Sequence, residues 1–390
     1  MKKRKIIFIL ITSILIYLLY WILEPFNIIP FNQTPDSLAK IEQHLNCSIS
    51  NKFDENSKDL INSSISKSDV LGISIAVYDS ECGTWLSTAG YSNKRSKEKP
   101  NKTSLFRIAS ISKSMTAVGI LQLYEKGNLD LDLPIQNYLP EFPKKKEGDI
   151  TIRQLLRHTS GIPHYKSKAG IFNYSHYNSC IEAIDKFKNR ELDFQPGSSF
   201  SYSSFGYTLL GAIIERISGM TYQEYMQKYI WKPSGMTHTN VEDKDSNYEN
   251  KPDLYVKVGS LFIRLPTNDL SYTYSGGGII STSSDLLLFG EAVLSYQLIN
   301  PSTTEMMIKL SSEILDQKEY TYGWDSWISS KYGKIIEHNG AQLGASSFFR
   351  IYFDKKIVVA VLSNNLNSSE TTRNLSIEIA SNLLETKAMK

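Results

Sequence analysis

The chain has 390 residues, of which 41% are apolar and 21% are charged, as is typical of a globular protein with one large domain or two interlocked ones. Its 43 basic and 40 acidic residues are well mixed and leave a net charge of +3, so the charge gives no argument for a nucleic-acid partner. The three cysteines and six histidines form no CxxC, HExxH or HxH pattern, so the sequence predicts neither a metal site nor a cofactor. Cys47, Cys82 and Cys180 lie far apart, which is compatible with one disulfide or with none.

The N-terminus departs from this globular composition. Residues 2–5 are all basic, and residues 6–23 form an apolar run that only one Thr and one Ser interrupt. A helix needs about 20 such residues to cross a bilayer core, whereas a cleaved signal peptide has a shorter run followed by a small-residue cleavage site that is missing here. Because basic residues stay on the cytoplasmic side, we predict that residues 1–24 are a cytoplasmic tip and a single-pass transmembrane anchor, with the rest of the chain on the extracytoplasmic side.

Residues 25–50 are predicted to be a tether that merges into the first helix, and residues 51–387 to form one domain. Two strands are expected in residues 71–89, around a turn near Asp79, because β-branched and aromatic residues alternate with polar ones. The same pattern returns only near the C-terminus, in residues 320–328, 333–340, 346–354 and 356–364. Residues 368–387 then have helical spacing.

The segment between these two β regions has a different character. Residues 115–315, taken as approximate bounds, show helical periods and loops rich in Gly and Pro. The predicted fold class is therefore α+β. One antiparallel sheet is built from both chain ends with flanking helices, and a mainly helical region is inserted between its two halves.

The pentapeptide SISKS occurs twice, beginning at Ser64 and at Ser110. Each copy contains Ser-x-x-Lys, a spacing used by enzymes whose serine nucleophile is activated by a lysine, although one such match alone is more often an ordinary surface turn. Ser64 ends a polar, weakly helical stretch, where the helix carbonyls repel a developing oxyanion. Ser110 instead precedes residues of helical spacing, so free backbone N–H groups there favour negative charge. Lys113 lies on the same helical face and can reach the Ser110 hydroxyl, so we predict that the second copy is reactive.

Two further clusters carry groups that suit the same chemistry. Tyr202 lies in a loop that enters an apolar helix, and a tyrosine there can pass a proton between Lys113, the nucleophile and the leaving group. In a predicted strand pair, Gly340 would let substrate lie against the strand edge, and the N–H of Ala341 would complete an oxyanion hole with that of Ser110. Alternatively, Tyr202 is an aromatic residue of the core, and His338, two positions before Gly340, is a solvated histidine at the end of a strand.

These residues together resemble the serine β-lactamase-like and penicillin-binding family. The three motifs, in chain order, are Ser110-x-x-Lys113, Tyr202-Ser203-Ser204 and His338-Asn339-Gly340. The closest branch is the group of class C β-lactamases, D-alanyl-D-alanine carboxypeptidases and esterases, and the resemblance extends over about residues 55–385. It implies an acylated serine, a lysine and tyrosine that share the general base and acid roles, and His338 in the position that holds Lys or His in relatives.

The motifs depart from the family pattern at two positions. Ser204 stands where relatives have an Asn that contacts the substrate amide, and Asn339 stands where they have a Thr that helps bind the substrate carboxylate. Both changes weaken the expectation of a D-Ala-D-Ala or β-lactam substrate without affecting acyl transfer itself. The resemblance therefore implies a membrane-anchored serine hydrolase that acts on a peptide, ester or amide outside the cytoplasm. The alternative is a penicillin-binding sensor or binding module that is acylated without turnover.

Overall fold

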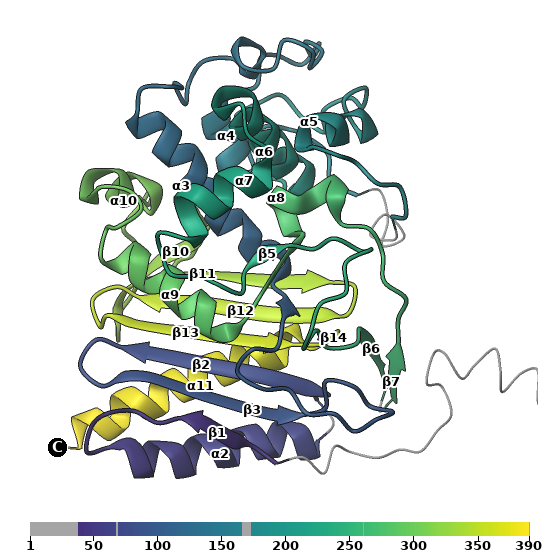
Figure 1. Ribbon diagram of the computed structural model, residues 1–390. Helices are drawn as coiled ribbons and strands as arrows, with labels where there is room; N and C mark the ends of the chain where they lie inside the picture. The colour runs from purple at the N-terminus through teal and green to yellow at the C-terminus, as the bar shows by residue number, and fades with distance from the viewer. Residues whose placement is uncertain (1–37, 68, 166–172, 260, 390) are drawn as a thin grey trace, which may run out of the picture.

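The computed structural model describes residues 38–389, except residues 68, 166–172 and 260 (Figure 1). The predicted membrane anchor, residues 1–24, and the first part of the predicted tether lie outside the described residues. None of the helices in the described part of the chain combines the length and the hydropathy that a membrane span requires.

The centre of the fold is one antiparallel sheet of eight strands, in the order β1-β3-β2-β13-β12-β11-β10-β9. The N-terminal and C-terminal strands meet where β2 pairs with β13 along its whole length, which confirms the predicted sheet from both chain ends. The strands are β1 (Lys40–Gln43), β2 (Gly72–Asp79), β3 (Gly83–Gly90), β9 (Glu319–Tyr320), β10 (Asp325–Ser329), β11 (Gly333–Gln342), β12 (Ala345–Tyr352) and β13 (Ile357–Ser363).

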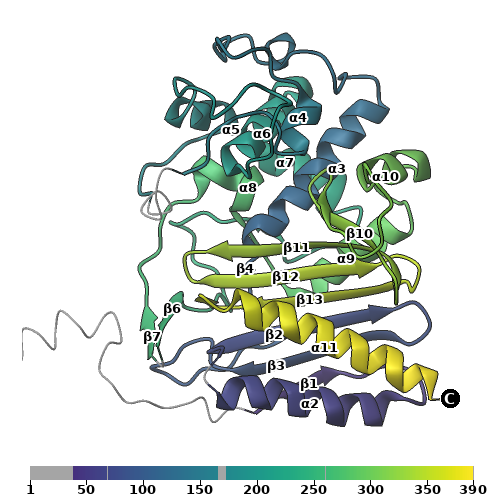
Figure 2. The ribbon, with the colours of Figure 1, turned by 180° about the vertical axis from the view of Figure 1, so that it is seen from behind.

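Helices cover both faces of this sheet, and its central strands are therefore apolar on both sides. On one face, α2 (Ser50–Ser66) and α11 (Ser369–Ala388) lie side by side across the strands (Figure 2). Val359 and Val361 of β13 belong to the apolar cluster on that face. Val358 on the opposite face packs against α9 (Ser283–Leu294), whose Gly290 leaves room for it.

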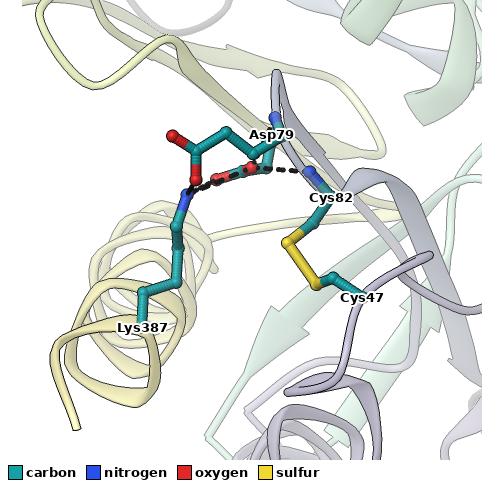
Figure 3. Close-up of a disulfide and its surroundings, with 5 residues drawn as sticks. Cys47, Asp79, Cys82 and Lys387 are labelled. Atoms are coloured by element: carbon teal, nitrogen blue, oxygen red, sulfur yellow. Dashed lines mark hydrogen bonds and ion pairs between the residues drawn. A yellow bond between two sulfur atoms is a disulfide. The ribbon is translucent and has the colours of Figure 1, made fainter. Parts of the chain in front are cut away.

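Part of the predicted tether, residues 25–50, belongs to the folded domain. Strand β1 pairs with β3 at the sheet edge, and Cys47 forms a disulfide with Cys82 in the turn between β2 and β3 (Figure 3). Asp79 accepts a hydrogen bond of 2.9 Å from the Cys82 N–H, and its carboxylate lies 3.0 Å from the Lys387 ammonium of α11 (Figure 3). Residues 40–43 of the predicted tether are thus part of the sheet, and a four-residue edge strand is too short to produce a recognisable alternation in the sequence.

The inserted region is mainly helical, as predicted, but it also contributes short strands to two small sheets. One sheet has the order β4-β8-β5 and the other β14-β6-β7. The sequence pattern predicts neither sheet, because strands of two to four residues show too few alternations to be recognised. The helices are α3 (Ser112–Glu125), α4 (Ile152–Leu156), α5 (Cys180–Ala183), α6 (Ser204–Ser218), α7 (Tyr222–Met226), α8 (Tyr274–Gly277) and α10 (Pro301–Met307). The short strands are β4 (Phe106–Arg107), β5 (Asn240–Val241), β6 (Tyr255–Val258), β7 (Leu261–Arg264), β8 (Ile279–Ser281) and β14 (Asn365–Leu366).

Helix α3 runs from the sheet into the helical region and is enclosed on all sides (Figure 1). Every residue from Ser112 to Leu123 is buried, and apart from Lys113 and Gln122 these residues are apolar or small around the whole circumference of the helix. It ends at Glu125, and Gly127 follows with a φ of 70°, in the left-handed region typical of a helix C-terminus. The start of α3 therefore lies where the sheet and the helical region meet.

Candidate active site

A cavity of about 320 Å³ lies at this junction of the sheet and the helical region. Five of the predicted site residues line it, namely Ser110, Tyr202, Ser204, Asn339 and Ala341. Three others, Lys113, His338 and Gly340, are buried beside it. The structure therefore brings together residues that lie as far apart in the sequence as positions 110 and 341.

Ser110 lies in a single 3₁₀ turn, Ala109–Ile111, that leads directly into α3. The Lys113 Nζ lies 3.1 Å from the Ser110 Oγ and is also hydrogen-bonded to the Ser204 Oγ, at 3.1 Å, and to the Gly276 carbonyl. Burial lowers the pKa of Lys113 well below its ordinary value. A neutral amine at this distance can accept the serine proton, so the pair has the geometry of a nucleophile and its general base.

The other copy of the pentapeptide lies in a different layer of the molecule. Ser64 is in the last turn of α2, on the face of the sheet that α11 also covers (Figure 2). Lys67 is exposed just beyond the end of that helix. The predicted difference between the two helix ends is thus present in the structure.

The segment that carries Ser110 is held directly against strand β11. Ala109 has a φ of 49°, in the left-handed region that non-glycine residues rarely adopt. The Ile108 carbonyl accepts a hydrogen bond of 2.8 Å from the Ser347 Oγ of β12. A Cβ on Gly340 would lie 2.5 Å from that carbonyl and 2.1 Å from the Ser347 Oγ. Gly340 is therefore needed where β11 meets the nucleophile segment, a different physical reason from the predicted contact with substrate.

Tyr202 lines the cavity close to the buried Lys113. Its hydroxyl is hydrogen-bonded to Ser110, and its ring centroid lies 4.8 Å from the Lys113 Nζ. Burial raises the pKa of Tyr202, so the phenol keeps its proton at neutral pH. A protonated phenol beside the nucleophile can donate to a leaving group and be reprotonated from Lys113.

The ring of Tyr202 is supported by His158, a residue of the turn after α4. His158 is buried, has a φ of 57° and packs against the Tyr202 ring with centroids 4.3 Å apart. Its Nδ1 accepts a hydrogen bond of 3.2 Å from the Ser203 N–H. These contacts fix both the ring and the backbone of the tyrosine motif.

His338 occupies the layer behind Tyr202, with ring centroids 6.3 Å apart. Its Nδ1 donates to the Asn339 carbonyl at 2.6 Å, and its Nε2 lies 3.0 Å from the hydroxyl of Tyr320. Burial lowers the pKa of His338 to about 3, so the ring is neutral. Both nitrogens thus have protein partners, and the sequence offers no signal for Tyr320, one of 23 tyrosines in the chain.

Strand β11 presents an open edge to the cavity. Strand β10 pairs with it only from Gly333 to Glu337, whereas β12 pairs with it as far as Gln342. In the described part of the chain, residues 338–342 therefore have a strand partner on one side alone, and Asn339 and Ala341 are exposed. An extended substrate could pair with this edge beside Ser110.

The cavity lining also includes residues that sequence reasoning does not identify, among them His164 and Tyr165. His164 and Tyr165 follow Pro163 in the loop after α4. Nothing in their local sequence marks them, because their place in the cavity depends on contacts with α6, far along the chain. Within the described residues there is no group of three or more His, Cys, Asp or Glu side chains placed to hold a metal ion.

Comparison with known proteins gives a consistent set of relatives. The profile of the Beta-lactamase family matches residues 51–382. The human mitochondrial serine beta-lactamase-like protein LACTB is 33% identical over 313 residues, which are 63% of this chain and 57% of that protein. A penicillin-binding protein of Bacillus subtilis is 33% identical over 304 residues, 72% of this chain and 65% of the relative, so the chain spans less than two thirds of both relatives. The octameric penicillin-binding protein homologue from Pyrococcus abyssi superposes with a TM-score of 0.75 at 25% identity, over 85% of this chain and 77% of that one.

Proposed function

The chain belongs to the beta-lactamase family, and from this we propose that it is a serine hydrolase that acts through an acyl-enzyme on a peptide, ester or amide. The observation that carries the proposal is the contact of 3.1 Å between the Lys113 Nζ and the Ser110 Oγ, with Tyr202 hydrogen-bonded to the same serine. A buried lysine with a lowered pKa, beside a serine at the start of a helix, is an arrangement that activates the hydroxyl.

The proposed reaction has two steps. Ser110 loses its proton to Lys113, its Oγ bonds to the substrate carbonyl carbon, and the oxyanion is stabilised by the backbone N–H groups of Ser110 and Ala341. Tyr202 donates a proton to the leaving group as its bond to the carbonyl carbon breaks, and Lys113 returns a proton to Tyr202. In the second step, a water molecule loses a proton to Lys113 and attacks the acyl carbon. The bond to the Ser110 Oγ then breaks, Ser110 regains its proton, and the acid is released. His338 acts through Tyr320 and the backbone at Asn339, as a positioning residue.

The cavity favours an uncharged substrate. Among the described residues that line it, none is Asp, Glu, Lys or Arg. The Ser204 hydroxyl already accepts a hydrogen bond from Lys113, and it is shorter than the Asn of relatives. We therefore expect activated esters or thioesters to be better substrates than D-alanyl-D-alanine peptides, whose carboxylate has no cationic partner in this lining.

Replacing Ser204 with Asn is expected to raise kcat/KM on a D-alanyl-D-alanine peptide roughly tenfold more than on a small p-nitrophenyl ester. The reason is that one hydrogen bond to an otherwise unpaired substrate amide is worth ~1–3 kcal/mol. The measurement is the peptide-to-ester ratio of kcat/KM for the wild type and Ser204→Asn. Efficient wild-type cleavage of the peptide, or an equal change on both substrates, would show that Ser204 does not set the preference. A single burst of product without turnover would favour the acylated binding module instead.

We also propose that residues 1–24 anchor the enzyme in a membrane with the catalytic domain outside the cytoplasm. The disulfide between Cys47 and Cys82 supports this placement, because disulfides persist mainly in oxidising compartments. The expected result is an uncleaved N-terminus together with digestion of the catalytic domain when protease is added to intact cells. A mature N-terminus near residue 25 or later, or protection of the domain on an accessible outer surface, would contradict the proposal.

A further inference from the structure

His164 lines the cavity, and its contacts define the protonation state and the tautomer of its ring. The Ser204 N–H, at the start of α6, lies 3.2 Å from the His164 Nδ1. A backbone N–H can only donate, so Nδ1 carries no proton, and the proton of the neutral imidazole is on Nε2. A charged ring would have to give up this hydrogen bond. Burial lowers the pKa of His164 to about 4, in agreement with a neutral ring.

The ring of His164 is held between two tyrosines. It packs on Tyr165 with centroids 4.2 Å apart and meets Tyr202 edge-on at 5.9 Å. In the described part of the chain, no hydrogen bond involves its Nε2, although the residue lines the cavity together with Ser110. The loop thus presents one oriented N–H donor to the space beside the nucleophile.

The neighbouring polar group on this wall is already used within the protein. The Ser204 Oγ accepts from the Lys113 Nζ at 3.1 Å, and the Ser204 N–H is bound to His164. A donor on this wall that remains for a substrate is the His164 Nε2–H. It is neutral, so it matches a carbonyl or ether oxygen and gives a carboxylate no countercharge.

We propose that His164 is a specificity-determining residue, whose Nε2–H donates a hydrogen bond to an oxygen acceptor on the acyl portion of the substrate. The enzyme then selects uncharged acyl groups that carry a carbonyl or ether oxygen beyond the scissile carbonyl. This inference rests on the proposed acyl transfer at Ser110, and it adds the substrate class that the motifs do not define.

Two substitutions separate recognition from a structural role. In His164→Asn the amide oxygen takes the place of Nδ1 and still accepts the Ser204 N–H, but no donor reaches the cavity. In His164→Gln the longer side chain places an amide N–H near the position of Nε2. His238 is an exposed histidine outside the cavity lining, so His238→Asn is the matched control.

The substrates are two p-nitrophenyl esters of nearly equal size, the N-acetylglycinate with an amide oxygen in its acyl group and the pentanoate without one. We expect the ratio of kcat/KM for these esters, corrected for their rates of alkaline hydrolysis, to fall roughly tenfold in His164→Asn. The ratio should stay within about threefold of the wild type in His164→Gln and His238→Asn. The kcat/KM on the pentanoate should be unchanged in His238→Asn, and a loss that a His164 variant shows equally on both esters cancels in the ratio.

Specific results would overturn the inference. An unchanged ratio in His164→Asn excludes recognition by Nε2, and an equal loss on both esters in both His164 variants assigns the residue a structural role at Ser204. If the wild type hydrolyses neither ester and neither ester acylates Ser110, the proposed function fails as well. If the wild type hydrolyses both esters but the kcat/KM ratio is the same in the wild type and in His164→Asn, only the inference fails.

Discussion

Replacing Lys113 with Met is expected to lower the rate of acylation at Ser110 by about three orders of magnitude or more, because nucleophile and base act as a unit. Met has a similar length and no basic atom, so it removes the proton acceptor 3.1 Å from the Ser110 Oγ while it fills the same buried space. The measurement is the single-turnover rate of acylation by a p-nitrophenyl ester.

The second pentapeptide supplies the matched control for this substitution. Lys67 has the same flanking sequence as Lys113 but lies exposed at the end of α2, so Lys67→Met should leave the rate unchanged. In the wild type, acylation requires the neutral amine, so the rate should rise with pH and reach its plateau well below 10.5, the ordinary pKa of lysine. A rate in Lys113→Met within tenfold of the wild type, in a folded protein, would exclude this lysine as the base.

Replacing Gly340 with Ala is expected to reduce acylation about a hundredfold, because a misplacement of about 1 Å near reacting atoms has an effect of that size. The added Cβ would lie 2.1 Å from the Ser347 Oγ and 2.5 Å from the Ile108 carbonyl, so β11 and the nucleophile segment must separate. Overpacking of this kind also lowers the free energy of unfolding by about 1–3 kcal/mol. Both quantities are measured, by single-turnover kinetics and by denaturant unfolding.

Gly206, in the first turn of α6, provides the control for Gly340. A Cβ at Gly206 would meet its nearest neighbour at 3.6 Å, an ordinary van der Waals contact. We therefore expect Gly206→Ala to keep both the acylation rate and the stability of the wild type, although it is also buried and close to the tyrosine motif. Wild-type acylation by Gly340→Ala would mean that the packing of β11 against Ile108 does not position Ser110.

The main features of the fold follow from long sequence patterns. Strand β13 and its neighbours are long enough to show runs of β-branched residues, and their position near the C-terminus predicts a sheet built from both chain ends. Strand β1 and the two small sheets contain strands of two to four residues, whose pairing is decided by tertiary contacts. The pairing of β1 with β3, and of Cys47 with Cys82 beside it, is likewise decided by tertiary contacts.

The site residues divide in the same way, into those that the local sequence predicts and those that tertiary contacts bring into the site. Ser110 and Lys113 are neighbours on one turn of helix, so their contact is encoded locally and could be predicted from spacing. Tyr202 and His338 could be placed only through the resemblance to a family. His164 and Tyr320 were not predicted, because each reaches the site through a partner more than fifteen residues away and neither has a local motif. For Gly340, the need for glycine was expected, but its cause is a contact with Ile108 that only the folded chain reveals.

The most direct test of the account is to locate the acylated residue. The full chain is treated with a fluorophosphonate, and the adduct is measured by intact mass and then assigned by peptide mapping in the wild type, Ser110→Ala and Ser64→Ala. We predict one adduct per chain on the peptide that contains Ser110, none in Ser110→Ala, and unchanged labelling in Ser64→Ala. Labelling that persists in folded Ser110→Ala, or that is lost in folded Ser64→Ala, would contradict the assignment of Ser110 as the nucleophile.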